Sequence, residues 1–169
     1  MTDHGYLCRC CGEWHDGLPF VYGPDAPAPW RDDLAGDESS VLEEDFCIIR
    51  AEHFFIRGRL VIAVHDAVQD FAWTVWVSLS RPNFSRALEL WTTPGREQEP
   101  PYFGWLCTEL PVYPVTTLHL KTHVHTQAVG ARPLIELEAT DHPLAMEQRT
   151  GITVDRVQQF AELLLHPSN

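Results

Sequence analysis

The feature that most restricts how this chain can fold is a group of cysteines near its start, in the sequence Cys8-Arg9-Cys10-Cys11-Gly12. Two thiolates three residues apart can bind one metal ion, and the glycine after them can take a backbone conformation that other residues avoid. His15 follows four residues after Cys11. This Cys-x-x-Cys-Gly knuckle predicts a zinc site that includes Cys8 and Cys11.

Zinc in structural sites takes four nitrogen or sulfur donors in a tetrahedron. One set of donors combines the knuckle with the next cysteine along the chain, giving Cys8, Cys11, His15 and Cys47. We expect Cys10 to point away, as the residue before the second ligand of a knuckle tends to do. Because four protein ligands leave no open position on the ion, the zinc is expected to be structural.

Each of these ligands also has a simpler interpretation. Cys8 and Cys11 could form a redox dithiol, although such a pair normally precedes a helix in a βαβ unit, which the sequence does not indicate. His15 could be an ordinary exposed loop residue. Cys47 could equally be an inert buried side chain, the usual state of a cysteine in an apolar strand, and Cys107 is expected to be such a core residue.

The charge of the chain excludes several classes of partner. Its 169 residues contain 24 Asp and Glu but only 12 Lys and Arg, for a net charge of −12, which repels phosphate backbones and anionic lipids. No apolar run approaches the ~18 residues of a membrane helix, and the start lacks the hydrophobic stretch of a signal peptide. We therefore expect a cytoplasmic protein that binds neither nucleic acid nor membrane, with an unknown protein or small-molecule ligand as its partner.

A chain of this length is expected to form a single domain over residues 1–169. Its predicted parts are a zinc-knuckle start (1–22), an acidic Pro-rich loop (23–45), a mainly antiparallel sheet with a short helix near 84–92 (46–138), and C-terminal helices (139–166). Residues 25–45 contain eight acidic side chains. We interpret them as a solvated loop, because the spacing of a calcium-binding EF-hand is missing.

Runs rich in Val, Ile, Phe and Trp predict strands at 46–50, 54–56, 60–65, 71–79, 102–107, 118–127 and 133–138, with a turn at Gly58. Asn83 is the expected N-cap of the first helix, Gly151 should end a helix over 144–149, and Thr153 should cap the last helix. Strands without regular intervening helices indicate an α+β fold. We expect an antiparallel sheet of about six to seven strands with the late helices packed on it.

Alternation along 118–127 places three histidines, His119, His123 and His125, together with Lys121 on one face of the predicted strand. With His142 from a neighbouring loop, they could form a metal-dependent hydrolase site. We favour an ordinary solvated strand face, because Lys121 would repel a cation. The aromatic segment 100–106 could line a ligand cleft, although core packing is the stronger interpretation.

Several short motifs together resemble the domain of unknown function 2199 family, a bacterial family of uncharacterised proteins. They are Cys8 and Cys11-Gly12 with His15, Asp45-Phe46-Cys47, Phe54-Phe55-Ile56-Arg57-Gly58, Trp73 with Trp76-Val77-Ser78-Leu79, Pro101-Tyr102-Phe103-Gly104-Trp105-Leu106, Arg132-Pro133, Asp141-His142-Pro143-Leu144-Ala145 and Gly151-Ile152. The resemblance covers nearly the whole chain. It implies a bacterial, cytoplasmic protein with a Cys/His start, and no reaction.

The residues and the resemblance together predict a zinc-stabilised α+β domain that serves as a binding or interaction module. The alternative is the hydrolase built on His119, His123, His125 and His142. No nucleophile elbow, phosphate-binding glycine loop or His-Glu-x-x-His helix is present, so no catalytic residue is assigned.

Overall fold

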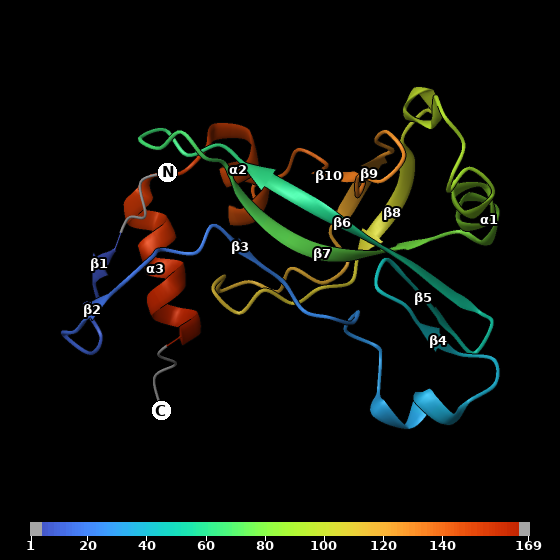
Figure 1. Cartoon of the computed structure of the whole chain (residues 1–169), viewed down its shortest axis with the longest axis horizontal. Helices are drawn as coiled ribbons and strands as arrows, with labels where there is room; N and C mark the ends of the chain where they lie inside the picture. The colour runs from blue at the N-terminus through green and yellow to red at the C-terminus, as the bar shows by residue number, and fades with distance from the viewer. Residues whose placement is uncertain (1–4, 166–169) are drawn as a thin grey trace.

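The computed structural model describes residues 5–165, so residues 1–4 of the predicted knuckle segment and residues 166–169 of the predicted domain lie outside it. Its centre is a closed barrel of five strands (Figure 1). The barrel strands, in order of pairing, are β6 (His53–Ile62), β7 (Phe71–Leu79), β8 (Tyr102–Leu106), β9 (Lys121–His125) and β10 (Leu134–Leu137). The last strand, β10, returns to β6 and closes the barrel.

The expectation of an α+β fold is confirmed, but the simple antiparallel sheet is not. Four of the barrel pairings are antiparallel, whereas β10 lies parallel to β6, with Leu134 opposite Arg59. Hydrophobic alternation marks which segments are extended but carries no information about which strands meet at the seam of a barrel. The parallel closure was therefore missed.

Short strands extend the barrel on both sides of the long β6–β7 pair. β5 (Phe46–Ile49) pairs with the first half of β6, and β4 (Val41–Leu42) pairs with β5. β3 (Val21–Tyr22) runs parallel to the start of β7. A separate hairpin of β1 (Tyr6–Leu7) and β2 (Trp14–His15) stands outside this sheet.

The predicted turn at Gly58 is wrong, because β6 continues straight through this residue. Gly58 instead lies where the chain before β10 approaches β6 to close the barrel. A β-carbon built on it would be 2.6 Å from Ile135 Cδ1 and 2.9 Å from the Pro133 carbonyl oxygen. Glycine is required here for close backbone approach.

We expect Gly58→Ala to destabilise the protein by about 1–3 kcal/mol, since the added methyl group would push the segment around Pro133 and Ile135 away from β6. Chemical denaturation measures this change. Gly36→Ala is the matched control, because a β-carbon there would have no heavy atom within 4 Å. Equal stabilities of the two variants would contradict the close approach at Gly58.

The three α-helices are α1 (Arg81–Glu89), α2 (Pro143–Thr150) and α3 (Val154–Leu165), and two short 3-10 helices are η1 (Asp32–Gly36) and η2 (Arg96–Gln98).

α2 ends before Gly151, and the Thr153 hydroxyl accepts a hydrogen bond from the Arg156 N–H at the start of α3, as predicted. The predicted cap of α1 is wrong. Ser80, not Asn83, caps this helix, because its hydroxyl accepts the Asn83 N–H while Pro82 occupies the first turn. No helix within residues 5–165 is long and apolar enough to cross a membrane.

An ion pair joins α1 to the start of β8. Arg86 Nη2 lies 2.8 Å from Glu99 Oε1, and the Tyr102 hydroxyl donates to Glu99 Oε2 at 2.8 Å. The Arg86 guanidinium and the Tyr102 hydroxyl lower the pKa of Glu99, against a smaller effect of burial that raises it. Burial and Glu99 together raise the pKa of Tyr102 to about 12.

The lowered pKa of Glu99 gives a pH dependence of stability with a defined sign. Its contribution is present above the carboxyl's unfolded pKa of about 4.3 and is lost as the pH falls through the lower folded pKa. The stability difference between wild type and Glu99→Gln should therefore shrink between about pH 6 and pH 3, measured by denaturant unfolding. The exposed neighbour substitution Glu97→Gln should show no such trend. A difference for Glu99→Gln that stays constant with pH would contradict this role.

Two hydrophobic clusters lie on opposite faces of β7. In the main core, Phe160 of α3 packs against Phe71 and Trp73, with ring centroids 5.1 and 4.9 Å apart. The second cluster contains Leu34, Cys47, Ile49, Phe55, Trp76 and Cys107. Part of the segment predicted as an acidic loop thus forms η1 and β4 and covers Trp76 with Leu34, while six of its eight acidic side chains are exposed.

Candidate metal centre

The hairpin of β1 and β2 shapes the cysteine-rich turn. Tyr6 pairs with His15 and Leu7 with Trp14, and the ladder continues where the Cys8 N–H donates to the Glu13 carbonyl at 2.9 Å. Gly12 has a φ of 73°, in the left-handed region that favours glycine. Its N–H donates to the Cys8 carbonyl at 2.9 Å, which folds the turn back on itself. The sequence Cys-x-x-Cys-Gly is thus the turn of a hairpin, as expected of a knuckle.

The turn brings together three of the four predicted ligands. The donor atoms of Cys8, Cys11 and His15 all lie within 4.8 Å of one another. Cys11 Sγ is 3.4 Å from His15 Nε2. Two donors on one tetrahedral zinc ion would be about 3.6 Å apart for sulfur and nitrogen, given Zn–S and Zn–N bonds of about 2.3 and 2.05 Å. The donor spacing could therefore hold a metal ion.

His15 is held in place by its partner across the hairpin. The rings of Tyr6 and His15 stack with centroids 5.2 Å apart and planes inclined by 22°. Tyr6 is buried, so the imidazole lies against a fixed aromatic surface. A ligand whose orientation is set before metal binding loses less conformational freedom when the metal binds.

Main-chain N–H groups favour a thiolate at Cys8. Burial of the side chain acts to raise its pKa, but hydrogen bonds from the N–H groups of Cys11 and Cys10 and from the Cys11 thiol lower the pKa below its usual value. Donors directed at a cysteine sulfur stabilise its negative charge, which is the form that binds metal. The turn therefore makes Cys8 easier to ionise than an ordinary cysteine.

Cys10 takes a different direction from the two ligands beside it. It does not join the group of Cys8, Cys11 and His15, and its thiol lies 3.8 Å from the Glu162 carbonyl oxygen on α3. The Cys10 thiol also comes within 4.8 Å of Cys8 Sγ and a Glu162 carboxylate oxygen. In this second group, the Glu162 carboxylate takes the place of the His15 imidazole. Two thiols with a carboxylate match the nitrogen and sulfur donors of structural zinc less well than two thiols with an imidazole.

A buried carboxylate attaches the knuckle to α3. Glu162 is 6% exposed, and its Oε2 accepts the main-chain N–H of Arg9 at 2.6 Å. The Arg9 guanidinium also donates to Glu162 Oε1, from Nη2 at 2.8 Å and Nε at 3.0 Å. Gln158, one turn earlier, donates to the Leu7 carbonyl at 2.9 Å. These contacts place the hairpin along α3 (Figure 1).

Cys47, the fourth predicted ligand, does not join the metal group. It lies in β5, at the opposite end of the molecule from β1 and β2 in Figure 1. Its side chain is fully buried in the second hydrophobic cluster beside Phe55 and Trp76. Burial raises the pKa of its thiol to about 12, which opposes the thiolate form that zinc requires. Cys47 and Cys107 are both buried core residues. For Cys107, the sequence predicts this position in the core.

The histidines of the alternative hydrolase site are not brought together. His123 and His125 lie on the outer face of β9 and pair with Glu138 and Glu136 on β10, at 3.4 and 3.2 Å. His119 precedes this strand with a φ of 68°. His142 caps α2, where its Nδ1 accepts the Leu144 N–H. Within the described part of the chain, these four residues form no group with the spacing of metal ligands.

The fold and this site together define an α+β barrel protein that carries a Cys/His hairpin with metal-binding geometry at its N-terminal end. The chain belongs to the family described as "Uncharacterized protein conserved in bacteria (DUF2199)", whose model matches residues 7–152. This match confirms the resemblance indicated by the sequence motifs. Searches of the curated proteins and of the solved structures found no match.

Proposed function

We propose that this protein is a zinc-binding module in which Cys8, Cys11 and His15 hold one structural zinc ion. The observation that carries the proposal is the convergence of two thiols and an imidazole within 4.8 Å on one short hairpin. Two sulfur donors with an imidazole favour zinc over magnesium or calcium, which prefer oxygen. Zinc requires a fourth donor besides these three.

The position of the site supports a structural task for the metal. A hairpin with strands of two residues each is too short to be stable alone. A zinc ion would join its turn to the end of β2, and the contacts of Arg9 with Glu162 would then attach a rigid unit to α3. Structural zinc contributes about 10–16 kcal/mol in small zinc-binding modules, which is ample to order such a segment.

The proposed biochemical role is that of a binding or interaction module. The hydrolase alternative lacks support from the structure, because His119, His123, His125 and His142 are separated and His142 is occupied as a helix cap. We place the protein in the cytoplasm, where a reducing environment keeps thiols available to a metal. All five cysteines are free thiols.

Metal analysis of the purified protein tests this proposal. We expect one zinc ion per chain, released only when the protein unfolds. His123→Ala should keep both the fold and the zinc content, since His123 lies on the outer face of β9 away from the hairpin. Protein without metal, or a metal that His123→Ala removes, would contradict the proposal.

A further inference from the structure

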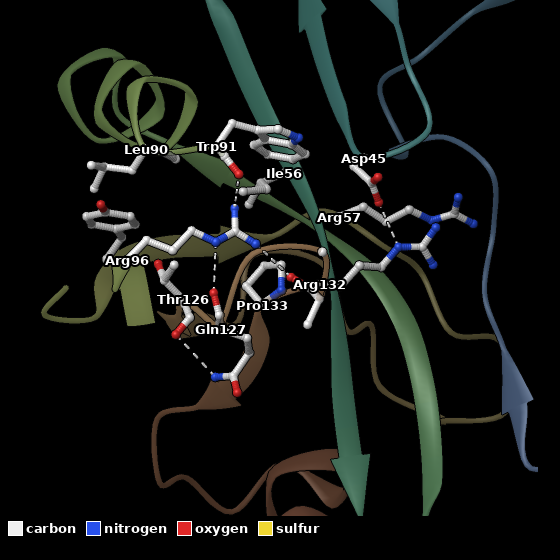
Figure 2. A pocket seen from close by; sticks show the side chains of 14 residues that line it. Asp45, Ile56, Arg57, Leu90, Trp91, Arg96, Thr126, Gln127, Arg132 and Pro133 are labelled. Carbon is white, nitrogen blue, oxygen red and sulfur yellow. Dashed lines mark hydrogen bonds and ion pairs between the residues drawn. The ribbon is translucent and has the colours of Figure 1, made fainter. Parts of the chain in front are cut away.

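A pocket lies away from the metal site, at the opposite end of the barrel from the hairpin. It opens between the end of α1, the start of β8 and the segment 126–133 that links β9 to β10 (Figure 2). Asp45 and Arg57 complete it from the side of β5 and β6. Tyr102, from the aromatic segment that the sequence offered as a possible cleft, forms part of its wall.

The charge of the pocket is opposite to that of the chain. Three arginines, Arg57, Arg96 and Arg132, line it, and the only acidic residue among its lining residues is Asp45. The whole chain contains twice as many acidic as basic residues. Cationic groups gathered in a concave site attract anions more strongly than the same groups dispersed over a surface.

Arg96 carries a charge that no carboxylate neutralises within residues 5–165. Its guanidinium donates to four main-chain carbonyls, those of Trp91, Gln127, Ala128 and Ala131, at 2.8 to 3.1 Å. Figure 2 shows this guanidinium between Trp91 and Gln127. Carbonyl groups satisfy the hydrogen bonds of an arginine but leave its net positive charge in place. The pocket is therefore built around a fixed cation.

Arg57 and Arg132 each have a nitrogen that makes no hydrogen bond within residues 5–165. The two Nη atoms of Arg57 donate to the carbonyls of Glu44 and Pro24, and Nη2 also pairs with Asp25 at 3.3 Å, whereas its Nε is buried and has no hydrogen-bond partner. Arg132 pairs with Asp45 through Nε at 2.7 Å and with Glu44 through Nη2 at 3.4 Å, while its Nη1 makes no hydrogen bond within the described residues. Glu44 is 81% exposed, so water screens its charge. Asp25 is fully exposed like most of Glu44, so in the part of the chain that the structure describes Asp45 is the only partly buried carboxylate that pairs with one of the three guanidinium groups.

Part of the wall is apolar, although Thr126 and Gln127 also line the pocket. Leu90 and Trp91, which follow α1, line the pocket together with Ile56 and Pro133 (Figure 2). The Arg96 guanidinium lies 5.7 Å from the centre of the Trp91 ring. A site that combines apolar side chains with arginine groups is suited to a ligand with two unlike ends.

We propose that this pocket binds a small organic anion whose carboxylate or phosphate group is held by the arginines and whose apolar group lies against Trp91. Arginine donors bind both of these oxyanions. The inference is independent of the zinc site, so a protein without metal but with a folded barrel should still bind the anion.

Titration with matched small molecules tests the proposal. The probes are benzoate and phenyl phosphate, with the neutral analogues benzamide and benzyl alcohol. Binding is followed by the indole N–H signal of Trp91 in NMR spectra, assigned through Trp91→Phe. We expect at least one anion to shift this signal and to bind about tenfold more tightly than its neutral analogue. Tighter binding of benzoate would indicate a carboxylate ligand, and tighter binding of phenyl phosphate would indicate a phosphate ligand.

A substitution of Arg132 tests whether a pocket arginine binds the anion. Arg132→Gln should weaken anion binding about tenfold and leave binding of the neutral analogue unchanged. Arg31→Gln makes the same charge change on an exposed residue outside the pocket and should have no effect. The proposal is overturned if the neutral probes bind as tightly as the anions to wild-type protein, if neither anion shifts the Trp91 signal below about 20 mM, or if folded Arg132→Gln binds the anions unchanged.

Discussion

Cys8→Ser is expected to reduce the zinc content of the purified protein from one ion per chain to almost none. Cys8 is the buried member of the ligand group, and hydrogen bonds from two main-chain N–H groups and the Cys11 thiol lower its pKa despite its burial. A serine hydroxyl does not replace a thiolate as a zinc ligand. Loss of one of three converging donors should therefore release the ion. Metal analysis of both proteins, purified in parallel, measures this effect.

Loss of the metal should also loosen the N-terminal hairpin. We expect amide hydrogen exchange at Cys8 and Gly12 to rise in Cys8→Ser, because the bonds that close the turn would open more often. The amides of β6 and β7 should keep their protection, since the barrel does not include the hairpin.

Cys47→Ala is the matched control for Cys8→Ser. It removes another fully buried cysteine, but one that lies among Phe55 and Trp76. We expect it to keep its zinc and to lose about 1–2 kcal/mol of stability through the cavity it creates. Loss of zinc in Cys47→Ala, or full zinc content in Cys8→Ser, would contradict the assignment of the ligands.

Glu162→Gln should destabilise the attachment of the hairpin to α3 by about 2 kcal/mol, because hydrogen bonds to a charged group are stronger than neutral ones. Glutamine keeps the size of the side chain but loses the charge and one of the two oxygens that accept from Arg9. The Arg9 side chain is 51% exposed, so solvent screening limits the contribution of the ion pair itself. Denaturant unfolding and hydrogen exchange at the Arg9 amide measure the change.

Asp155→Asn serves as the control for Glu162→Gln. Asp155 also pairs with Arg9, at 3.0 Å, but its side chain is 62% exposed. Exposed ion pairs contribute about 0–1 kcal/mol, so this variant should change the stability much less. Equal effects of the two substitutions would show that the buried position of Glu162 does not matter for the attachment.

The sequence was sufficient to predict that the side chains of Cys8, Cys11 and His15 lie close together. The spacing of Cys8 and Cys11, the glycine after them and the nearby His15 lie within eight residues, so the geometry of one turn determines their meeting. Cys47 could not be judged in this way. Its position depends on the pairing of β5 with β6, which places it in a core that the sequence pattern does not distinguish from a ligand position.

The closure of the barrel and the attachment of the hairpin depend on contacts between distant segments. Arg9 and Glu162 are separated by 153 residues, and neither is marked by a local motif. A signal for Glu162 was nevertheless present, since it is a carboxylate beside the apolar stripe of the last helix, next to Phe160 and Ala161. Buried charges in such places require a partner.

The pocket was the least predictable feature, because its arginines come from three separate regions of the chain. Arg57 is in β6, Arg96 begins η2, and Arg132 precedes β10. Only the tertiary fold brings them together. The sequence offered a partial signal in the aromatic segment 100–106, from which Tyr102 contributes to the pocket while Phe103 and Trp105 are exposed.

X-ray absorption at the zinc edge is the measurement that tests the central claim most directly, because it counts the sulfur donors around the metal. We predict two sulfurs at about 2.3 Å, from Cys8 and Cys11, with nitrogen or oxygen in the remaining positions, including the imidazole of His15. Three sulfurs would indicate another cysteine among the ligands. A zinc ion without sulfur ligands, or a protein that contains no zinc, would contradict the account.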